Sequence, residues 1–312
     1  MRTLYLNLGM PKTGSTSIQR AFSGYETETL ICPQLIRDNH SIIIKSSYMI
    51  DPKGRRPFKF STRTNSQIRK IQERRKQLLD NALNTEKDVF LSGETVLGDL
   101  SANELNNMFS DLNSKFDLVK VICYVRPVEQ LAASAFQQRV KGGSKHDFSL
   151  PIPRYQRYFG KLLKFLPREN ITFVRFNRAD LDGGDVVTDI SKRLGVTPPK
   201  TEKTLANQSL STEAVSAMYV LNKRIGRIIK NSVHTQLAAK LLENLISFGD
   251  TKFGFSEEII SAHVKACSDD IAWMEKLAGF ELTGCFKPVP DPVTSEKDLI
   301  PRATDFYLQH DS

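Results

Sequence analysis

The chain has 312 residues, of which 40% are hydrophobic and 25% charged, a composition typical of a globular protein. It contains no run of about 18 apolar residues and no signal-peptide pattern, so we expect no transmembrane helix. Its four cysteines lack CxxC spacing and its five histidines lack metal-ligand spacing. These patterns favour free thiols in the cytoplasm and argue against a zinc site.

The net charge of +9 is concentrated in residues 41–76. This stretch holds eleven basic side chains but only two acidic ones, Asp51 and Glu73. It suits an anionic cofactor, an acidic polymer or an acidic surface, and a solvated basic helix face explains it equally well. Aromatic side chains are not interleaved as a stacking platform needs, so nucleic-acid binding is not expected.

Residues 4–19 predict a strand, a tight loop and a helix. Apolar and polar side chains alternate over 4–8, which is typical of a strand. The loop that follows holds Lys12 and Gly14, and the hydroxyl side chains after Gly14 can cap a helix. Backbone N–H groups and the helix dipole would then point at one spot. The pattern therefore predicts an anion-binding loop.

Strands and helices alternate through the next part of the chain. Strands are expected at 88–92, 118–125 and 171–176. Helices are expected at 66–84, from Ser101 with Glu104 in the capping-box position, from Val128, at 155–166 and at 184–194. This alternation predicts an α/β fold with a central parallel sheet and helices on both faces.

The remaining segments have less regular patterns. Residues 23–65 are interpreted as a loop-rich insertion, with a short element at 42–44. Residues 205–285 are expected to form a helical C-terminal part, with helices from Ser211, at 233–248 and at 256–276. Four prolines after Cys285 favour an extended tail over 286–312. We expect these parts to form a single domain, 1–312.

The position of the lysine in the first loop distinguishes two kinds of enzyme. A P-loop kinase carries G-x-x-x-x-G-K-[ST], whereas here Lys12 precedes Gly14 and Ser15 takes the place of that lysine. The segment Pro11-Lys-Thr-Gly-Ser-Thr-Ser17 instead resembles the 5'-phosphosulfate loop of sulfotransferases that use 3'-phosphoadenosine 5'-phosphosulfate (PAPS). The resemblance implies that Lys12 stabilises the leaving phosphate. It also implies that the whole segment binds the cofactor: Pro11, Lys12, Thr13, Gly14, Ser15, Thr16 and Ser17.

A second segment resembles the family's 3'-phosphate site. Arg126 ends a predicted strand, and Ser134 lies about two helical turns further on. The family pairs an arginine and a serine at this offset, and a guanidinium can bind a phosphate bidentately. Phe176, at the end of a later strand, resembles a residue that stacks on the adenine, although a place in the core explains it as well.

The catalytic base is expected at the end of the strand 88–92. The segment Leu-Ser-Gly-Glu94-Thr resembles the glutamate type found in many carbohydrate and tyrosine members of the family. A carboxylate within hydrogen-bond reach can take the proton of an alcohol acceptor. Asp38 and His40, in the insertion, are the competing bases, and His40 has the more suitable intrinsic pKa.

The resemblance implies transfer of a sulfuryl group from PAPS to a hydroxyl, without a metal. The sequence shows neither the Lys-Thr-His motif nor the Arg-Lys-Gly loop of the cytosolic phenol and steroid enzymes, and we expect no membrane anchor like that of Golgi members. It is most similar to soluble bacterial sulfotransferases acting on a glycan or glycolipid, which leaves peripheral membrane contact open. The alternatives are a P-loop-type kinase or NTPase and a non-catalytic polyanion-binding protein using residues 41–76.

Overall fold

A computed structural model of the chain describes residues 1–143, 147–200, 209–225, 245 and 248–310. Apart from residues 245 and 248, the helix expected over 233–248 lies outside the described residues. The chain divides into two compact units. The first comprises Met1–Arg126 and Arg154–Glu202, and the second comprises Pro127–Pro153 and Lys203–Ser312. Each is described by itself, and the single domain expected over 1–312 stays a prediction.

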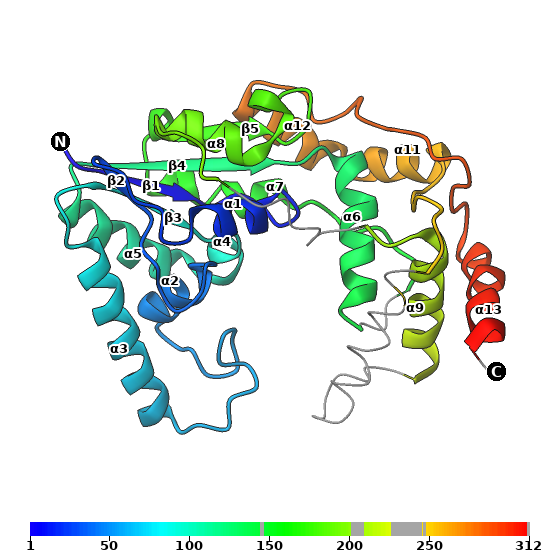
Figure 1. The fold of residues 1–312 in the computed structure, drawn as a ribbon, viewed down its shortest axis with the longest axis horizontal. Helices are drawn as coiled ribbons and strands as arrows, with labels where there is room; N and C mark the ends of the chain where they lie inside the picture. The colour runs from blue at the N-terminus through cyan, green and yellow to red at the C-terminus, as the bar shows by residue number, and fades with distance from the viewer. Residues whose placement is uncertain (144–146, 201–208, 226–244, 246–247, 311–312) are drawn as a thin grey trace. The chain divides into compact units, whose positions relative to one another are not determined.

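The first unit is built on five parallel strands (Figure 1). In chain order they are β1 (Thr3–Asn7), β2 (Leu30–Ile31), β3 (Asp88–Ser92), β4 (Leu118–Val125) and β5 (Ile171–Arg175). Their order across the sheet is β2-β3-β1-β4-β5. β1 is therefore central, and its last residue, Asn7, pairs with Ser92 of β3 and Ile122 of β4. The predicted α/β class with a parallel sheet is confirmed.

Helices cover both faces of this sheet. On one face, α1 (Ser15–Phe22) and α8 (Val186–Leu194) share an apolar core with the strand residues Phe90, Ile122 and Tyr124. Side chains alternate along a strand, so Phe173 of β5, next to the core residue Val174, points to the other face. There it meets Phe159 of α7 edge-on. The other elements of this unit are α2 (Ser41–Tyr48), α3 (Asn65–Leu83), α4 (Val96–Asp99), α5 (Ala102–Lys115), α7 (Tyr155–Phe159) and the 3₁₀ turns Leu162–Lys164, Arg168–Asn170 and Asp182–Gly184.

The insertion over 23–65 holds more regular structure than its sequence predicts. β2 adds an edge strand beside β3, and the apolar run at 42–44 lies inside the helix α2. Both elements are short, so their stability comes from packing against the rest of the unit rather than from local propensity. The helix expected over 155–166 is also interrupted, because α7 ends before Gly160 and a separate 3₁₀ turn follows.

Glu104 ties the insertion to α5. This residue of α5 is 1% exposed, and it closes the predicted capping box with Ser101. Its carboxylate also accepts hydrogen bonds from the Ile50 N–H at 2.9 Å and from two guanidinium nitrogens of Arg55 at 2.6 and 2.8 Å. Burial acts to raise the pKa of Glu104, but the hydrogen bonds from Arg55, Ser101 and Ile50 outweigh it and lower the pKa to about 2.

Glu104→Ala is expected to lower the free energy of unfolding by about 3 kcal/mol, because Arg55 and the Ile50 amide lose their acceptor. Since the pKa of Glu104 falls on folding from 4.5 to about 2, its stabilisation is complete above the unfolded value and disappears as the pH falls through the folded one. Urea unfolding between about pH 7 and about pH 2 measures both effects. The exposed residue Glu86 provides the control, Glu86→Ala. Equal stability and pH dependence in the two variants would contradict this role for Glu104.

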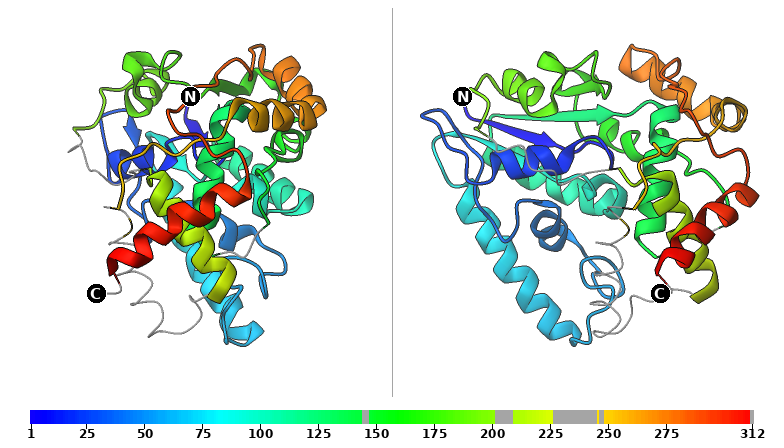
Figure 2. Two further views of the ribbon diagram at one scale, coloured as in Figure 1. Left: turned by 90° about the vertical axis from the view of Figure 1, so that its right-hand side faces the viewer. Right: turned by 45° about the vertical axis from the view of Figure 1, so that its right-hand side comes forward.

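The second unit is helical in the residues described. Its helices are α6 (Val128–Lys141), α9 (Thr212–Ile225), α11 (Glu257–Ala266), α12 (Ser268–Ala278) and α13 (Leu299–His310), with a 3₁₀ turn at Glu296–Asp298. α9 and α13 pack along each other, and α6 contacts α9 and α11 (Figure 2). Phe136 of α6 stacks on Tyr219 and Phe253 at the centre of this core.

Two expectations for the second unit need correction. The single helix expected over 256–276 is two helices, α11 and α12, which meet at Cys267. The extended tail expected over 286–312 was wrong for its last part, because α13 begins at Leu299. Pro301 lies in the first turn of α13, where a helix does not need the missing N–H.

Candidate anion-binding site

The site is built on the loop between β1 and α1. Lys12 and Gly14 have positive φ angles of 71° and 73°. A positive φ is uncommon for a residue with a side chain, so surrounding contacts must hold Lys12 in place. The Thr13 hydroxyl donates to the Met10 carbonyl at 2.6 Å, which closes the loop on itself. Loops with such left-handed residues gather successive N–H groups into a concavity that suits an anion.

Gly9 packs tightly against β4, and Gly14 packs tightly against α8 and the residue that follows β5. A Cβ on Gly9 would lie 3.0 Å from the Tyr124 nitrogen of β4. A Cβ on Gly14 would lie 2.8 Å from Val186 Cγ1 and 3.2 Å from Phe176 Cε2. Larger residues would push the loop away from β4 and from the segment that follows β5. The two glycines therefore allow the loop to approach β4 and Phe176 closely.

Helix α1 begins at this loop. Gly14 is its N-cap residue, and its first backbone bonds run from the Ser17 and Ile18 N–H groups to the Gly14 carbonyl, at 2.9 and 3.2 Å. Among the described residues, no side chain caps this helix. The amides of Ser15 and Thr16 precede those bonds, and the helix dipole adds positive charge. This backbone therefore fits a phosphate or sulfate group.

Arg126 joins the loop to the end of β5. Its Nη1 donates to the Lys12 carbonyl at 2.7 Å, and its guanidinium carbon lies 5.5 Å from the centre of the Phe176 ring. The Tyr155 hydroxyl donates to the Arg126 carbonyl at 2.6 Å and fixes the backbone there. Burial lowers the pKa of Arg126 to about 10, so the guanidinium stays charged at neutral pH. The structure thus brings three predicted site residues together: Lys12, Arg126 and Phe176.

Glu94 follows β3 at the same edge of the sheet. Its carboxylate is half-buried and accepts a hydrogen bond from the hydroxyl of Ser15, the first residue of α1. The backbone before it is held by the Gly93 N–H, which donates to the Asn7 carbonyl at 2.9 Å. The predicted base therefore lies directly beside the predicted anion-binding loop.

His40 lies in a different environment, since it is only 1% exposed. Its Nδ1 accepts a hydrogen bond from the Ser92 N–H at 3.1 Å. Burial lowers the pKa of His40 to about 4, against the smaller opposing effects of the Pro33 backbone and Asp38. The ring is neutral at pH 7 and packs the insertion against β3. This geometry favours Glu94 as the base, although the choice between the two stays a prediction.

The remaining predicted residues lie as follows. Pro11 and Thr16 are half-buried, and Ser17 is exposed. Ser134 is a half-buried residue of α6 and belongs to the second unit, whereas Arg126 belongs to the first. The pairing of Arg126 with Ser134 on one phosphate stays a prediction.

Two residues near Glu94 have no signal in the sequence. Tyr158 of α7 has a pKa raised first by burial and then by the charge of Asp99, with the smallest effect coming from Glu94. Lys45 is buried, with its ammonium 2.8 Å from the Thr95 hydroxyl and 2.5 Å from Asp99. Lys45 belongs to the basic stretch, but it serves an internal ion pair instead of an outside ligand. Neither residue occurs in a recognisable motif.

No family model matches the chain, and a search of curated proteins finds no match. Among the described residues, no three His, Cys, Asp or Glu side chains gather as metal ligands. No helix in these parts of the chain is long and apolar enough to span a bilayer. Functional inference therefore depends on the geometry of the loop and of the residues around it.

Proposed function

We propose that this protein is a PAPS-dependent sulfotransferase whose acceptor is a hydroxyl of a glycan or glycolipid. One observation carries the proposal: the Ser15 hydroxyl, at the start of an uncapped helix behind a Lys-Thr-Gly loop, donates to the Glu94 carboxylate. An anion-binding backbone and a proton acceptor therefore lie side by side. Transfer to an alcohol needs both, since negative charge grows on the leaving group while the alcohol loses its proton.

Each residue has a role in this proposal. When bound, PAPS supplies the activated sulfuryl group and a bisphosphorylated adenosine leaving group. The amides after Lys12 hold the 5'-phosphate, and the Lys12 ammonium offsets its growing charge. Glu94 takes the proton of the acceptor hydroxyl. Arg126 and Phe176, which contact each other, offer a cation and an aromatic face to the nucleotide.

The cytoplasmic location also belongs to the proposal. The four cysteines are all free and buried. Buried free thiols are ordinary in a reducing compartment, whereas exported proteins of this size more often carry disulfides.

A thermal-shift comparison of nucleotides tests the proposal. We expect 3'-phosphoadenosine 5'-phosphate at about 100 times its Kd to stabilise the protein by about 2.7 kcal/mol. Adenosine 5'-phosphate is the matched control, because it lacks only the 3'-phosphate, and it should shift the melting temperature less. A clear shift with ATP and magnesium but none with the 3'-phosphorylated nucleotide would favour a P-loop kinase or NTPase. A shift with heparin alone would favour a polyanion-binding protein.

A further inference from the structure

The loop between α2 and α3 carries the most exposed apolar side chains of the first unit after Met1. Phe60 is 71% exposed and Ile50 is 65% exposed. Both lie in the segment 50–64, which leads to the N-terminal end of α3 (Figure 1). Large apolar side chains that protrude within a charged segment mark a surface that meets another apolar phase or partner.

Basic side chains lie close to these two apolar residues in the sequence. In the segment 50–64 the exposed charged residues are Lys53, Arg56, Lys59 and Arg63, with Asp51 as the acidic one. Lys59 lies directly at the tip, with its ammonium 5.5 Å from the centre of the Phe60 ring. The first half of α3 adds exposed Arg69, Lys70 and Arg74 against Glu73. This surface therefore combines positive charge with protruding apolar groups.

The loop is anchored to the unit beneath it. Arg55 and the Ile50 amide bond to the buried Glu104, at 2.6 and 2.9 Å. Phe58, only 5% exposed, lies under the guanidinium of Arg75, whose carbon is 5.4 Å from the ring centre. Arg55 and Phe58 thus anchor the loop to the unit, whereas the next two residues, Lys59 and Phe60, are exposed.

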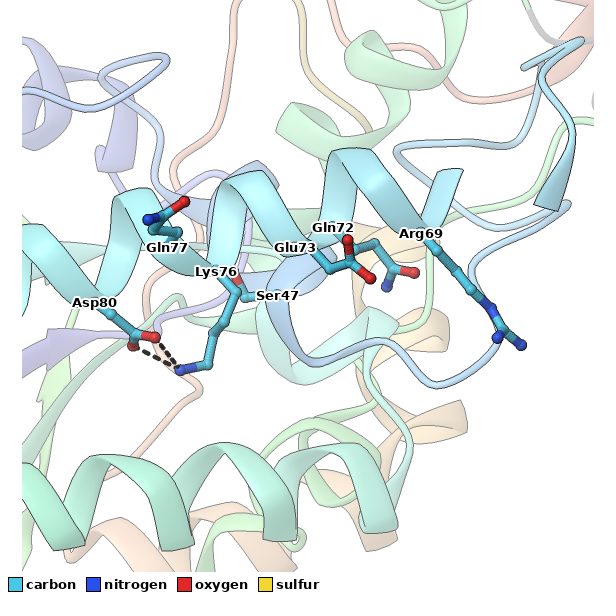
Figure 3. A pocket seen from close by; sticks show the side chains of 7 residues that line it. All are labelled: Ser47, Arg69, Gln72, Glu73, Lys76, Gln77 and Asp80. Carbon is cyan, nitrogen blue, oxygen red and sulfur yellow. Dashed lines mark hydrogen bonds and ion pairs between the residues drawn. The ribbon is translucent and has the colours of Figure 1, made fainter. Parts of the chain in front are cut away.

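The charges further along α3 are balanced. A shallow groove there is lined by Ser47, Arg69, Gln72, Glu73, Lys76, Gln77 and Asp80 (Figure 3). Lys76 bonds Asp80 at 2.6 and 2.7 Å, while the Arg69 side chain extends away from that pair in Figure 3. On α3 the excess positive charge therefore lies in its first half, next to the segment 50–64.

We propose that this surface binds peripherally to an anionic lipid bilayer, with the Phe60 ring and Ile50 entering the interface and the surrounding Lys and Arg side chains contacting lipid headgroups. Basic side chains near an anionic bilayer add binding energy individually, and aromatic rings are favoured at its interface. A soluble polyanion would use the charges but not the two apolar side chains. The inference is independent of the proposed enzymatic function.

Vesicle sedimentation with the full chain tests whether this surface binds an anionic bilayer. We expect binding to phosphatidylcholine vesicles containing phosphatidylserine, and little binding to phosphatidylcholine alone. Lys59→Glu should weaken binding roughly 10- to 30-fold, because it reverses one charge near the headgroups. Phe60→Ala should weaken it roughly 5-fold and leave the salt dependence in place.

An equivalent pair elsewhere in the unit provides the control. Leu163 is 40% exposed and is followed by exposed Lys164, so Leu163→Ala and Lys164→Glu make the same chemical changes outside the segment 50–64 and α3. These variants should bind like the wild type, and all four should melt at the wild-type temperature. Absence of binding to the anionic vesicles, equal binding to neutral ones, or unchanged binding by Phe60→Ala would overturn the inference. Unchanged vesicle binding by Phe60→Ala, together with tight binding to heparin, would identify a polyanion-binding surface instead.

Discussion

Glu94→Gln is expected to lower the rate of sulfuryl transfer by about 10³-fold and to leave the affinity for 3'-phosphoadenosine 5'-phosphate unchanged. The amide cannot take the acceptor's proton. Its carbonyl oxygen can still accept the hydrogen bond that Ser15 gives to Glu94, so the loop and the start of α1 keep their contact. Single-turnover transfer rates and nucleotide thermal shifts, measured on the same preparation, separate the two effects.

Two further variants sharpen this test. Glu86→Gln changes an exposed glutamate just before β3, at the opposite end of that strand from Glu94, and should keep full activity. Ser15→Ala leaves the carboxylate but removes the hydroxyl that holds it, so a smaller loss of roughly 10-fold is expected. Full activity in Glu94→Gln, with loss in a folded His40→Asn variant, would assign the proton transfer to His40.

The parts of the fold that could be predicted have strong local signals. The apolar run of β4 and the alternation in β1 are sufficient to predict strands. The capping box of Ser101 and Glu104 predicts where α5 begins. The carboxyl ends of parallel strands lie at the same edge of a sheet. This rule alone predicts that Arg126 and Glu94 lie beside the first loop.

Other elements depend on contacts that a sequence does not display. β2 is only two residues long and exists because it pairs with β3. α13 contains Pro301, and it forms because that proline falls in the first turn and the helix packs on α9. A proline disrupts the interior of a helix but is tolerated in its first turn. Which of these applies cannot be predicted until the residue at which the helix begins is known.

The candidate site also has features that the sequence predicts and features that depend on contacts in the folded chain. The motif predicts that Lys12 and Arg126 bind phosphates, but it does not predict that Arg126 bonds the Lys12 carbonyl. His40 has a favourable intrinsic pKa, yet its burial lowers that pKa to about 4 and gives it a packing contact with β3. Because the burial of a side chain depends on how the whole chain folds, the intrinsic pKa of histidine alone makes His40 look like a better base than it is in the structure.

Lys12→Ala is expected to lower the transfer rate by about 10³-fold, because charge on the leaving 5'-phosphate loses its nearest predicted cation. The affinity for 3'-phosphoadenosine 5'-phosphate should fall about 10-fold, since the product carries the same phosphate. The backbone conformation of the loop, with φ of 71° at this position, is no harder for alanine than for lysine. The carbonyl that receives Arg126 is also retained, so the fold should be unchanged.

Two further variants, Lys12→Arg and Lys164→Ala, serve as comparisons for Lys12→Ala. The arginine keeps the positive charge and should recover part of the rate, which separates charge from shape. Lys164 is an exposed residue of the 3₁₀ turn Leu162–Lys164 and belongs to none of the predicted site segments, so its alanine variant should transfer at the wild-type rate. A non-catalytic polyanion-binding protein predicts a different pattern, in which Lys12→Ala keeps its affinity for polyanions and only charge reversal at the basic residues of 41–76 weakens it. Wild-type transfer by Lys12→Ala would exclude the loop as the site where the leaving phosphate is stabilised.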